Sequence, residues 1–132
     1  MLVITLCSIV LYGYYSVLAV EELTAATFAS KVFGSTHSDS LNPSPVWLVE
    51  FYSSMCFSCK EFTPIWDAVA KSLSPYLSTG KINIDDKANM QFVQTLGVLD
   101  IGIPHLVLYT QQGLSNGVNI PIGNACIWNI LE

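Results

Sequence analysis

A chain of 132 residues with a net charge of −5, in which hydrophobic residues make up 52%, has room for one domain with one core. This length excludes a multidomain architecture. The five basic residues are all lysines, so the chain lacks the basic face with which nucleic-acid-binding proteins meet phosphates. Nucleic acid is therefore excluded as a partner.

Residues 1–19 form an uncharged, apolar segment that ends in Val17-Leu18-Ala19, the small-residue pattern that signal peptidase prefers. We interpret this segment as a signal peptide, followed by a domain over residues 20–132. The alternative is an uncleaved N-terminal anchor, because about 20 apolar residues suffice to span a bilayer. Either reading places the domain on the oxidising side of a membrane, where disulfide chemistry has substrates.

The domain opens with a predicted strand and helix. Val20–Thr24 predicts a short strand, and Thr24 can cap a helix over Ala25–Phe33. The segment Gly34–Pro45 is rich in Ser, Pro and Asn and has almost no apolar residues, so it predicts a surface loop. His37 lies in this loop and is predicted to be solvated.

The central apolar segment is Val46–Tyr52, which is rich in β-branched, aromatic and aliphatic residues without helical spacing. This pattern predicts a strand that is buried on both faces. Glu50 is the exception, since burial raises the pKa of a carboxyl group by removing the hydration of its charged form. Such a group can take up and release protons. The alternative is a glutamate that is paired at the end of the strand.

A helix is predicted to follow this strand and to begin at two cysteines. Its apolar residues recur at the spacing of one helix face, at Phe62, Ile65, Trp66, Val69, Ala70 and Leu73. Pro64 lies inside this pattern, so it should bend the helix rather than end it. The helix is expected to end near Ser74-Pro75.

Cys56 and Cys59 stand three residues apart at the start of this helix. Unpaired N–H groups and the helix dipole favour an anion there, and the thiol pKa of such cysteines falls from about 8.5 to roughly 3.5–7.5. We predict that Cys56 is a nucleophile and Cys59 the resolving thiol. The alternatives are an inert disulfide and half of a zinc site, which only Cys126, His37 and His105 could complete.

Shorter elements are predicted in the second half of the chain. They are a strand over Lys81–Asp85, a helix over Ala88–Leu96, a hairpin of strands Leu106–Thr110 and Val118–Ile122, and the beginning of a helix over Asn124–Glu132. Gly97 is expected to end the helix over Ala88–Leu96.

The residues around the cysteines resemble the catalytic a-type domain of protein disulfide isomerases, within the thioredoxin superfamily. The matching residues are Glu50-Phe51-Tyr52, Cys56, Cys59, Lys60 and Pro64. The resemblance covers about Glu22–Gly123. It implies an α/β, thioredoxin-like fold with a central mixed β-sheet flanked by helices, of which the last would be short.

The resemblance also implies roles for individual residues. Glu50 would lie beneath Cys59 and accept its proton when that thiol attacks a mixed disulfide. Lys81 would lie close to the acid and modulate its pKa, although a surface lysine at a strand end is the alternative. Pro104 would follow a cis peptide bond and face the cysteines, and Ile103 would offer backbone groups to a substrate strand.

Three positions depart from the family pattern. Met55 stands where the family usually has Trp, Phe57-Ser58 replaces Gly-His, and Gly97–Pro104 is two residues longer than usual. A histidine between the cysteines makes the disulfide more oxidising, so its replacement by serine predicts a less oxidising couple. His105 would compensate if it faced the site, but a histidine at the start of a core strand is more often structural.

We therefore expect a thiol–disulfide oxidoreductase that acts on cysteines of client polypeptides through a mixed disulfide at Cys56. Its redox partner would be a thiol such as glutathione, and neither a cofactor nor a metal is expected. The expected location is the lumen of the endoplasmic reticulum, with secretion or membrane anchoring as alternatives. Membrane contact is expected only if residues 1–19 stay uncleaved. The alternative function is a non-catalytic or membrane-tethered module that binds clients beside Pro104.

Overall fold

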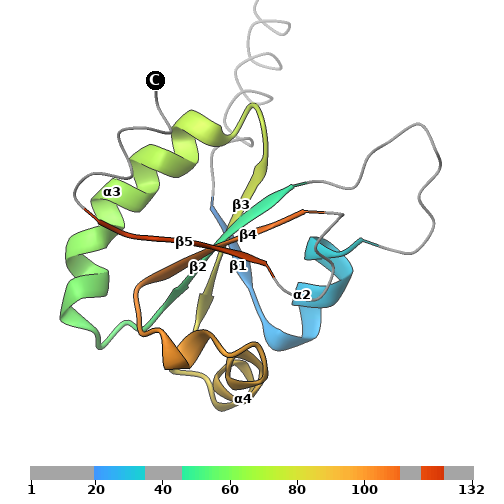
Figure 1. Cartoon of the computed structure of the whole chain (residues 1–132), viewed down its shortest axis with the longest axis vertical. Coiled ribbons are helices and arrows are strands. Elements are labelled where there is room, and N and C mark those ends of the chain that lie inside the picture. The colour runs from blue at the N-terminus through green and yellow to red at the C-terminus, as the bar shows by residue number, and fades with distance from the viewer. Residues whose placement is uncertain (1–19, 35–45, 111–116, 124–132) are drawn as a thin grey trace, which may run out of the picture.

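The computed structural model describes residues 20–34, 46–110 and 117–123. Within these ranges, helices flank one five-stranded sheet (Figure 1). The elements in chain order are β1 (Glu21–Leu23), α2 (Ala25–Val32), β2 (Trp47–Tyr52), α3 (Phe57–Leu73), β3 (Ser78–Asn83), α4 (Lys87–Thr95), the 3₁₀ helix η1 (Val98–Asp100), β4 (His105–Tyr109) and β5 (Val118–Ile120).

The sheet is mixed and has the strand order β1-β3-β2-β4-β5. β3 runs parallel to both of its neighbours, whereas β4 is antiparallel to β2 and to β5. This arrangement confirms the α/β, thioredoxin-like fold that the sequence predicted. It also makes β2 the central strand of the sheet, so the cysteines follow directly after the central strand.

Each face of the sheet carries its own apolar cluster. α2 and α4 cover one face, and α3 covers the other (Figure 1). The first cluster includes Phe28, Val49, Phe51, Ile82, Val93 and Val107, and the second includes Leu48, Phe62, Trp66, Val69 and Leu106. Because successive side chains of a strand point to opposite faces, β2 contributes to both clusters. This explains why its sequence is apolar without alternation.

Local signals set where the helices begin and end. The Thr24 side chain caps α2 in a capping box with Thr27, as the sequence predicted for Thr24. The Asp86 side chain caps α4. Gly97 follows α4 with a φ of 70°, a left-handed conformation that glycine adopts at no steric cost. α3 continues through Pro64, as expected.

Two predictions about the elements were wrong in detail. β3 begins at Ser78 and ends at Asn83, whereas the sequence predicted Lys81–Asp85. The Ser78 N–H donates to the Val46 carbonyl over 2.9 Å, so pairing with β2 extends the strand to Ser78 although it includes Gly80, a residue type that is disfavoured in strands. Ile65 was predicted on the inner face of its helix and is exposed.

Several predictions lie outside the described residues. They concern the signal segment 1–19, most of the loop with His37, the connection between the two hairpin strands at 111–116, the last helix and Cys126 as a candidate zinc ligand. Among the residues that are described, no helix has the length and apolar character to cross a membrane.

Candidate active site

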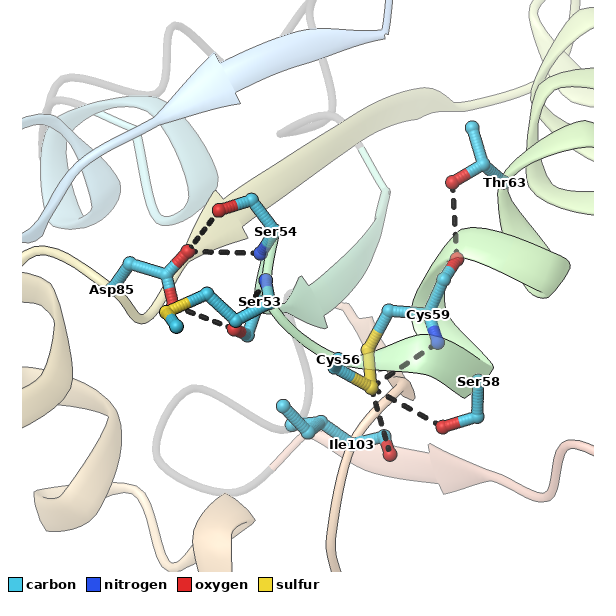
Figure 2. Close-up of a disulfide and its surroundings, with 9 residues drawn as sticks. Ser53, Ser54, Cys56, Ser58, Cys59, Thr63, Asp85 and Ile103 are labelled. Carbon is cyan, nitrogen blue, oxygen red and sulfur yellow. Dashed lines mark hydrogen bonds between the residues drawn. A yellow bond between two sulfur atoms is a disulfide. The ribbon is translucent and has the colours of Figure 1, made fainter.

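Cys56 occupies the position immediately before α3, where its side chain caps the helix. Its Sγ accepts a hydrogen bond from the backbone N–H of Cys59 over 3.1 Å (Figure 2). The first N–H groups of a helix have no partner within the helix and favour an acceptor with negative charge. The structure therefore places the predicted nucleophile where a thiolate is stabilised.

The two cysteines form a disulfide, with their Cα atoms 5.3 Å apart. They differ in access, because Cys59 is only 2% exposed while Cys56 is half-buried. An incoming sulfur therefore reaches Cys56 first. The Ser58 hydroxyl lies 3.2 Å from the Sγ of Cys56, where it can donate a hydrogen bond to a thiolate.

The turn between β2 and α3 is held by Asp85, which sequence reasoning missed. Its carboxylate accepts hydrogen bonds from the Ser53 hydroxyl over 2.5 Å, from the Ser54 N–H over 2.9 Å and from the Ser54 hydroxyl (Figure 2). These bonds lower the pKa of Asp85, those from the two hydroxyl groups most. A sequence signal exists, since Asp85 and the serines follow neighbouring parallel strands, whose carboxyl ends share one edge of the sheet.

A segment far away in the sequence completes the surroundings of Cys56. The peptide bond between Ile103 and Pro104 is cis, and the carbonyl oxygen of Ile103 lies 3.9 Å from the Sγ of Cys56 (Figure 2). The loop between η1 and β4 thus brings a backbone carbonyl acceptor to the reactive sulfur. This is where the resemblance placed Ile103 and Pro104.

Glu50 is buried in β2 with 3% of its surface exposed. Burial raises its pKa from 4.5 to about 7, an effect that Lys81 opposes and that the negative charges of Asp67 and Glu22 reinforce. Lys81 lies directly opposite Glu50 on β3. The structure therefore places the predicted proton acceptor and the predicted modulating lysine on neighbouring strands.

Other side chains near the cysteines have simpler surroundings. His105 is buried, and its Nε2 lies 3.0 Å from Oδ1 of Asn119, which supports the structural interpretation of this histidine. Met55 and Phe57 flank Cys56 and are 84% and 75% exposed. Among the described residues, no three His, Cys, Asp or Glu side chains gather as a metal site would require.

A family comparison agrees with this geometry. The model of the family described as Thioredoxin matches residues 19–123, most of the chain. The chain belongs to the thioredoxin family. The family assignment that the cysteine motif suggested is thereby confirmed.

Relatives include both isomerases and a thioredoxin. The chain is 38% identical over 88 residues to protein disulfide-isomerase 2-3 of Arabidopsis thaliana, covering 67% of this chain and 17% of that protein. It is 37% identical over 79 residues to thioredoxin of Chlamydia pneumoniae, covering 60% and 72%. The chain thus spans less than a fifth of the plant isomerase but most of the bacterial thioredoxin.

A solved structure shows the same fold. The J-Trx1 fragment of ERdj5 matches with a TM-score of 0.65 and 21% identity, covering 85% of this chain and 48% of that fragment.

Proposed function

We propose that this protein is a thiol–disulfide oxidoreductase of the protein disulfide isomerase type, which acts on cysteines of client polypeptides through a mixed disulfide at Cys56. The observation that carries this proposal is the asymmetry of the pair. The accessible sulfur of Cys56 caps a helix, whereas Cys59 is buried one turn along it.

Oxidation of a client proceeds in two displacements. A client thiolate attacks the Sγ of Cys56, the bond to Cys59 breaks, and the sulfur of Cys59 leaves with the electron pair and takes a proton. A second client thiolate then attacks the client sulfur of the mixed disulfide and releases Cys56 as a thiolate, which the helix N-terminus stabilises. The client loses two electrons and the protein gains them. The reverse sequence reduces a client disulfide.

Glu50 is proposed as the group that gives this proton to Cys59 and takes it back. With a pKa of about 7 it is present in both protonation states at neutral pH, which suits a general acid–base group. It shares its face of the sheet with Leu106, which packs in one cluster with Phe62 and Trp66 of α3. Glu50 therefore lies on the side of the sheet that α3, and with it Cys59, covers.

Residues 103–104 are proposed as the site that aligns the client. The Ile103 carbonyl near the reactive sulfur can accept a hydrogen bond from the backbone of an extended client segment, in the manner of β-strand addition.

The secretory pathway is the proposed location, with the endoplasmic reticulum lumen first. The apolar segment 1–19 and the isomerase among the relatives support it. Glutathione is the proposed exchange partner of the resting disulfide. Equilibrating the protein in glutathione buffers and quantifying the oxidised fraction would give its reduction potential, which separates a reductant from an oxidant.

A client-binding module without turnover is the second candidate. It is favoured by the exposed apolar side chains of Met55 and Phe57 on either side of Cys56, because such side chains can hold an unfolded client. An insulin-reduction assay separates the two. The enzyme accelerates precipitation of the insulin B chain over the Cys56→Ser variant. Equal rates for the two proteins would rule out the enzyme and leave the client-binding module as the candidate.

A further inference from the structure

A row of in-register residues crosses the sheet from one edge to the other. Glu22 of β1 pairs with Lys81 of β3, Lys81 pairs with Glu50 of β2, and the row continues through Leu106 and Ile120. Paired residues on neighbouring strands project to the same face. Lys81 therefore stands between two carboxylates, one at the exposed edge of the sheet and one in its buried centre.

Lys81 binds the outer of these two carboxylates. Its Nζ lies 3.6 Å from an oxygen of Glu22, and among the described residues it forms no ion pair with Glu50. The Nζ also lies 5.3 Å from the centre of the Tyr52 ring. The Tyr52 hydroxyl donates a hydrogen bond over 3.0 Å to the other oxygen of Glu22, so the Glu22 carboxylate is itself held in place.

We propose that Glu22 is a positioning residue, which holds the Lys81 ammonium at the edge of the sheet and thereby keeps Glu50 able to take up a proton at neutral pH. The role of this proton in the reaction of Cys59 rests on the proposed function. The positioning of Lys81 by Glu22 is independent of the proposed function.

The carboxylates of Glu22 and Glu50 compete for one cation, the Lys81 ammonium. An ammonium that moved toward the buried carboxylate would stabilise its charged form. Such a move would cost Lys81 its partner, its contact with the ring and part of its hydration, since its side chain is 35% exposed. Among the described residues, Asp67 of α3 also acts on Glu50, and its negative charge raises the pKa of that carboxyl group. The row contributes only apolar side chains from β4 and β5.

The chain offers a matched control at the preceding residue. Glu21 carries the same charge on the same strand but points to the opposite face, where it pairs with Lys31 of α2. Glu21→Gln removes one negative charge without releasing Lys81. Lys81→Met tests whether Glu22 acts through the lysine.

The experiment titrates Glu50 directly in the full chain. Carboxyl carbons of labelled glutamate are followed by NMR across pH, and the Glu50 signal is the one that Glu50→Gln removes. Glu22→Gln is expected to shift the Glu50 midpoint down by about half a pH unit or more. Glu21→Gln should shift it clearly less. In the Lys81→Met background, Glu22→Gln should lose most of its effect.

A kinetic readout on the same variants tests the link to the reaction. The reduced protein is mixed with a chromogenic aromatic disulfide such as dithiobis(nitrobenzoate). The first release of the chromophore reports attack by Cys56, and the second reports attack by Cys59 on the mixed disulfide. The pH midpoint of the second release should move down in Glu22→Gln together with the titration of Glu50.

The outcomes are distinct. If Glu22→Gln leaves the Glu50 titration unchanged, or shifts it equally with and without Lys81, the positioning role is wrong whatever the rates are. If the titration shifts as expected but the second release does not follow it, the positioning role holds and the proposed catalytic role of Glu50 fails.

Discussion

At the scale of single residues, Glu50 should control the rate at which the mixed disulfide is resolved. Glu50→Gln has nearly the same shape but accepts no proton at neutral pH. We expect attack by Cys56 to keep its rate while attack by Cys59 slows on the order of a hundredfold, the size of a general-base contribution. Quenched-flow trapping of the mixed disulfide measures both steps. If the mixed disulfide of the variant were resolved at the parental rate, Glu50 would have no catalytic role.

The same carboxyl group should make stability depend on pH. Its pKa is raised from 4.5 to about 7 in the folded state, so the folded chain binds this proton more tightly than the unfolded chain. The contribution to the unfolding free energy therefore declines as pH rises from about 4.5 to 7, by about 3 kcal/mol in all. Urea unfolding of parent and Glu50→Gln should agree near pH 4.5 and diverge in favour of the variant by pH 8.

No divergence between these two proteins would mean that Glu50 is hydrated or paired in solution. Because both proteins carry every other titrating group, their difference isolates this one.

Ser58 should support the thiolate of Cys56 in place of the histidine that isomerases have between their cysteines. Its hydroxyl lies 3.2 Å from the reactive sulfur, and a hydrogen bond to a charged group contributes about 1.5 kcal/mol or more. Ser58→Ala is therefore expected to slow alkylation of Cys56 by iodoacetamide on the order of tenfold at neutral pH. Ser72→Ala, far along the same helix, is the control and should have no effect. Equal rates in the two variants would contradict the contact.

At the scale of elements, the turn from β2 to α3 should depend on Asp85. Asp85→Asn removes the charge that strengthens the hydrogen bonds from the Ser53 hydroxyl and the Ser54 N–H. Amide hydrogen exchange at Ser54 is therefore expected to quicken several-fold. Asp86→Asn is the neighbouring control, because asparagine caps a helix as well as aspartate does. Unchanged exchange in Asp85→Asn would show that the turn is held by other contacts.

The pH dependence of this turn follows from the lowered pKa of Asp85. Since the folded value lies below the ordinary 3.8, the stabilisation is complete above that value. It is lost as pH falls through the lower folded value. Exchange at Ser54 in the parent should therefore approach that of Asp85→Asn only in strong acid.

At the scale of the whole molecule, the packing of β5 on β4 should tolerate no side chain at Gly117. A Cβ there would lie 2.2 Å from Cγ1 of Val107 and 2.8 Å from Cε1 of Tyr109, two buried residues of the core. We expect Gly117→Ala to destabilise the fold by about 1–3 kcal/mol through overpacking. Gly123→Ala, whose Cβ would meet nothing within 4 Å, is the control. Chemical unfolding that finds the two variants equal would show that β5 moves aside freely.

The sequence by itself determined the features whose causes are local. Thr24 indicated a helix cap, the apolar residues on both sides of Glu50 indicated that β2 is buried on both faces, and the spacing beyond Cys59 indicated α3. These signals depend on residues that are close in the sequence, so they can be recognised without knowledge of the fold. Together with the residues around the cysteines, they sufficed to indicate the family.

Only the tertiary structure decided which distant groups meet. β3 begins earlier than its own residues suggest because β2 offers it partners. Asp85 reaches the serines across 31 and 32 positions of the sequence, and Ile103 reaches Cys56 across 47. Lys81 lies opposite Glu50, where it was expected, but its ion pair is with Glu22, because strand register places a second carboxylate within its reach on the exposed edge of the sheet. Strand register and burial arise from packing between segments that are remote in the sequence. They determine which carboxylate Lys81 binds and how readily Glu50 takes up a proton.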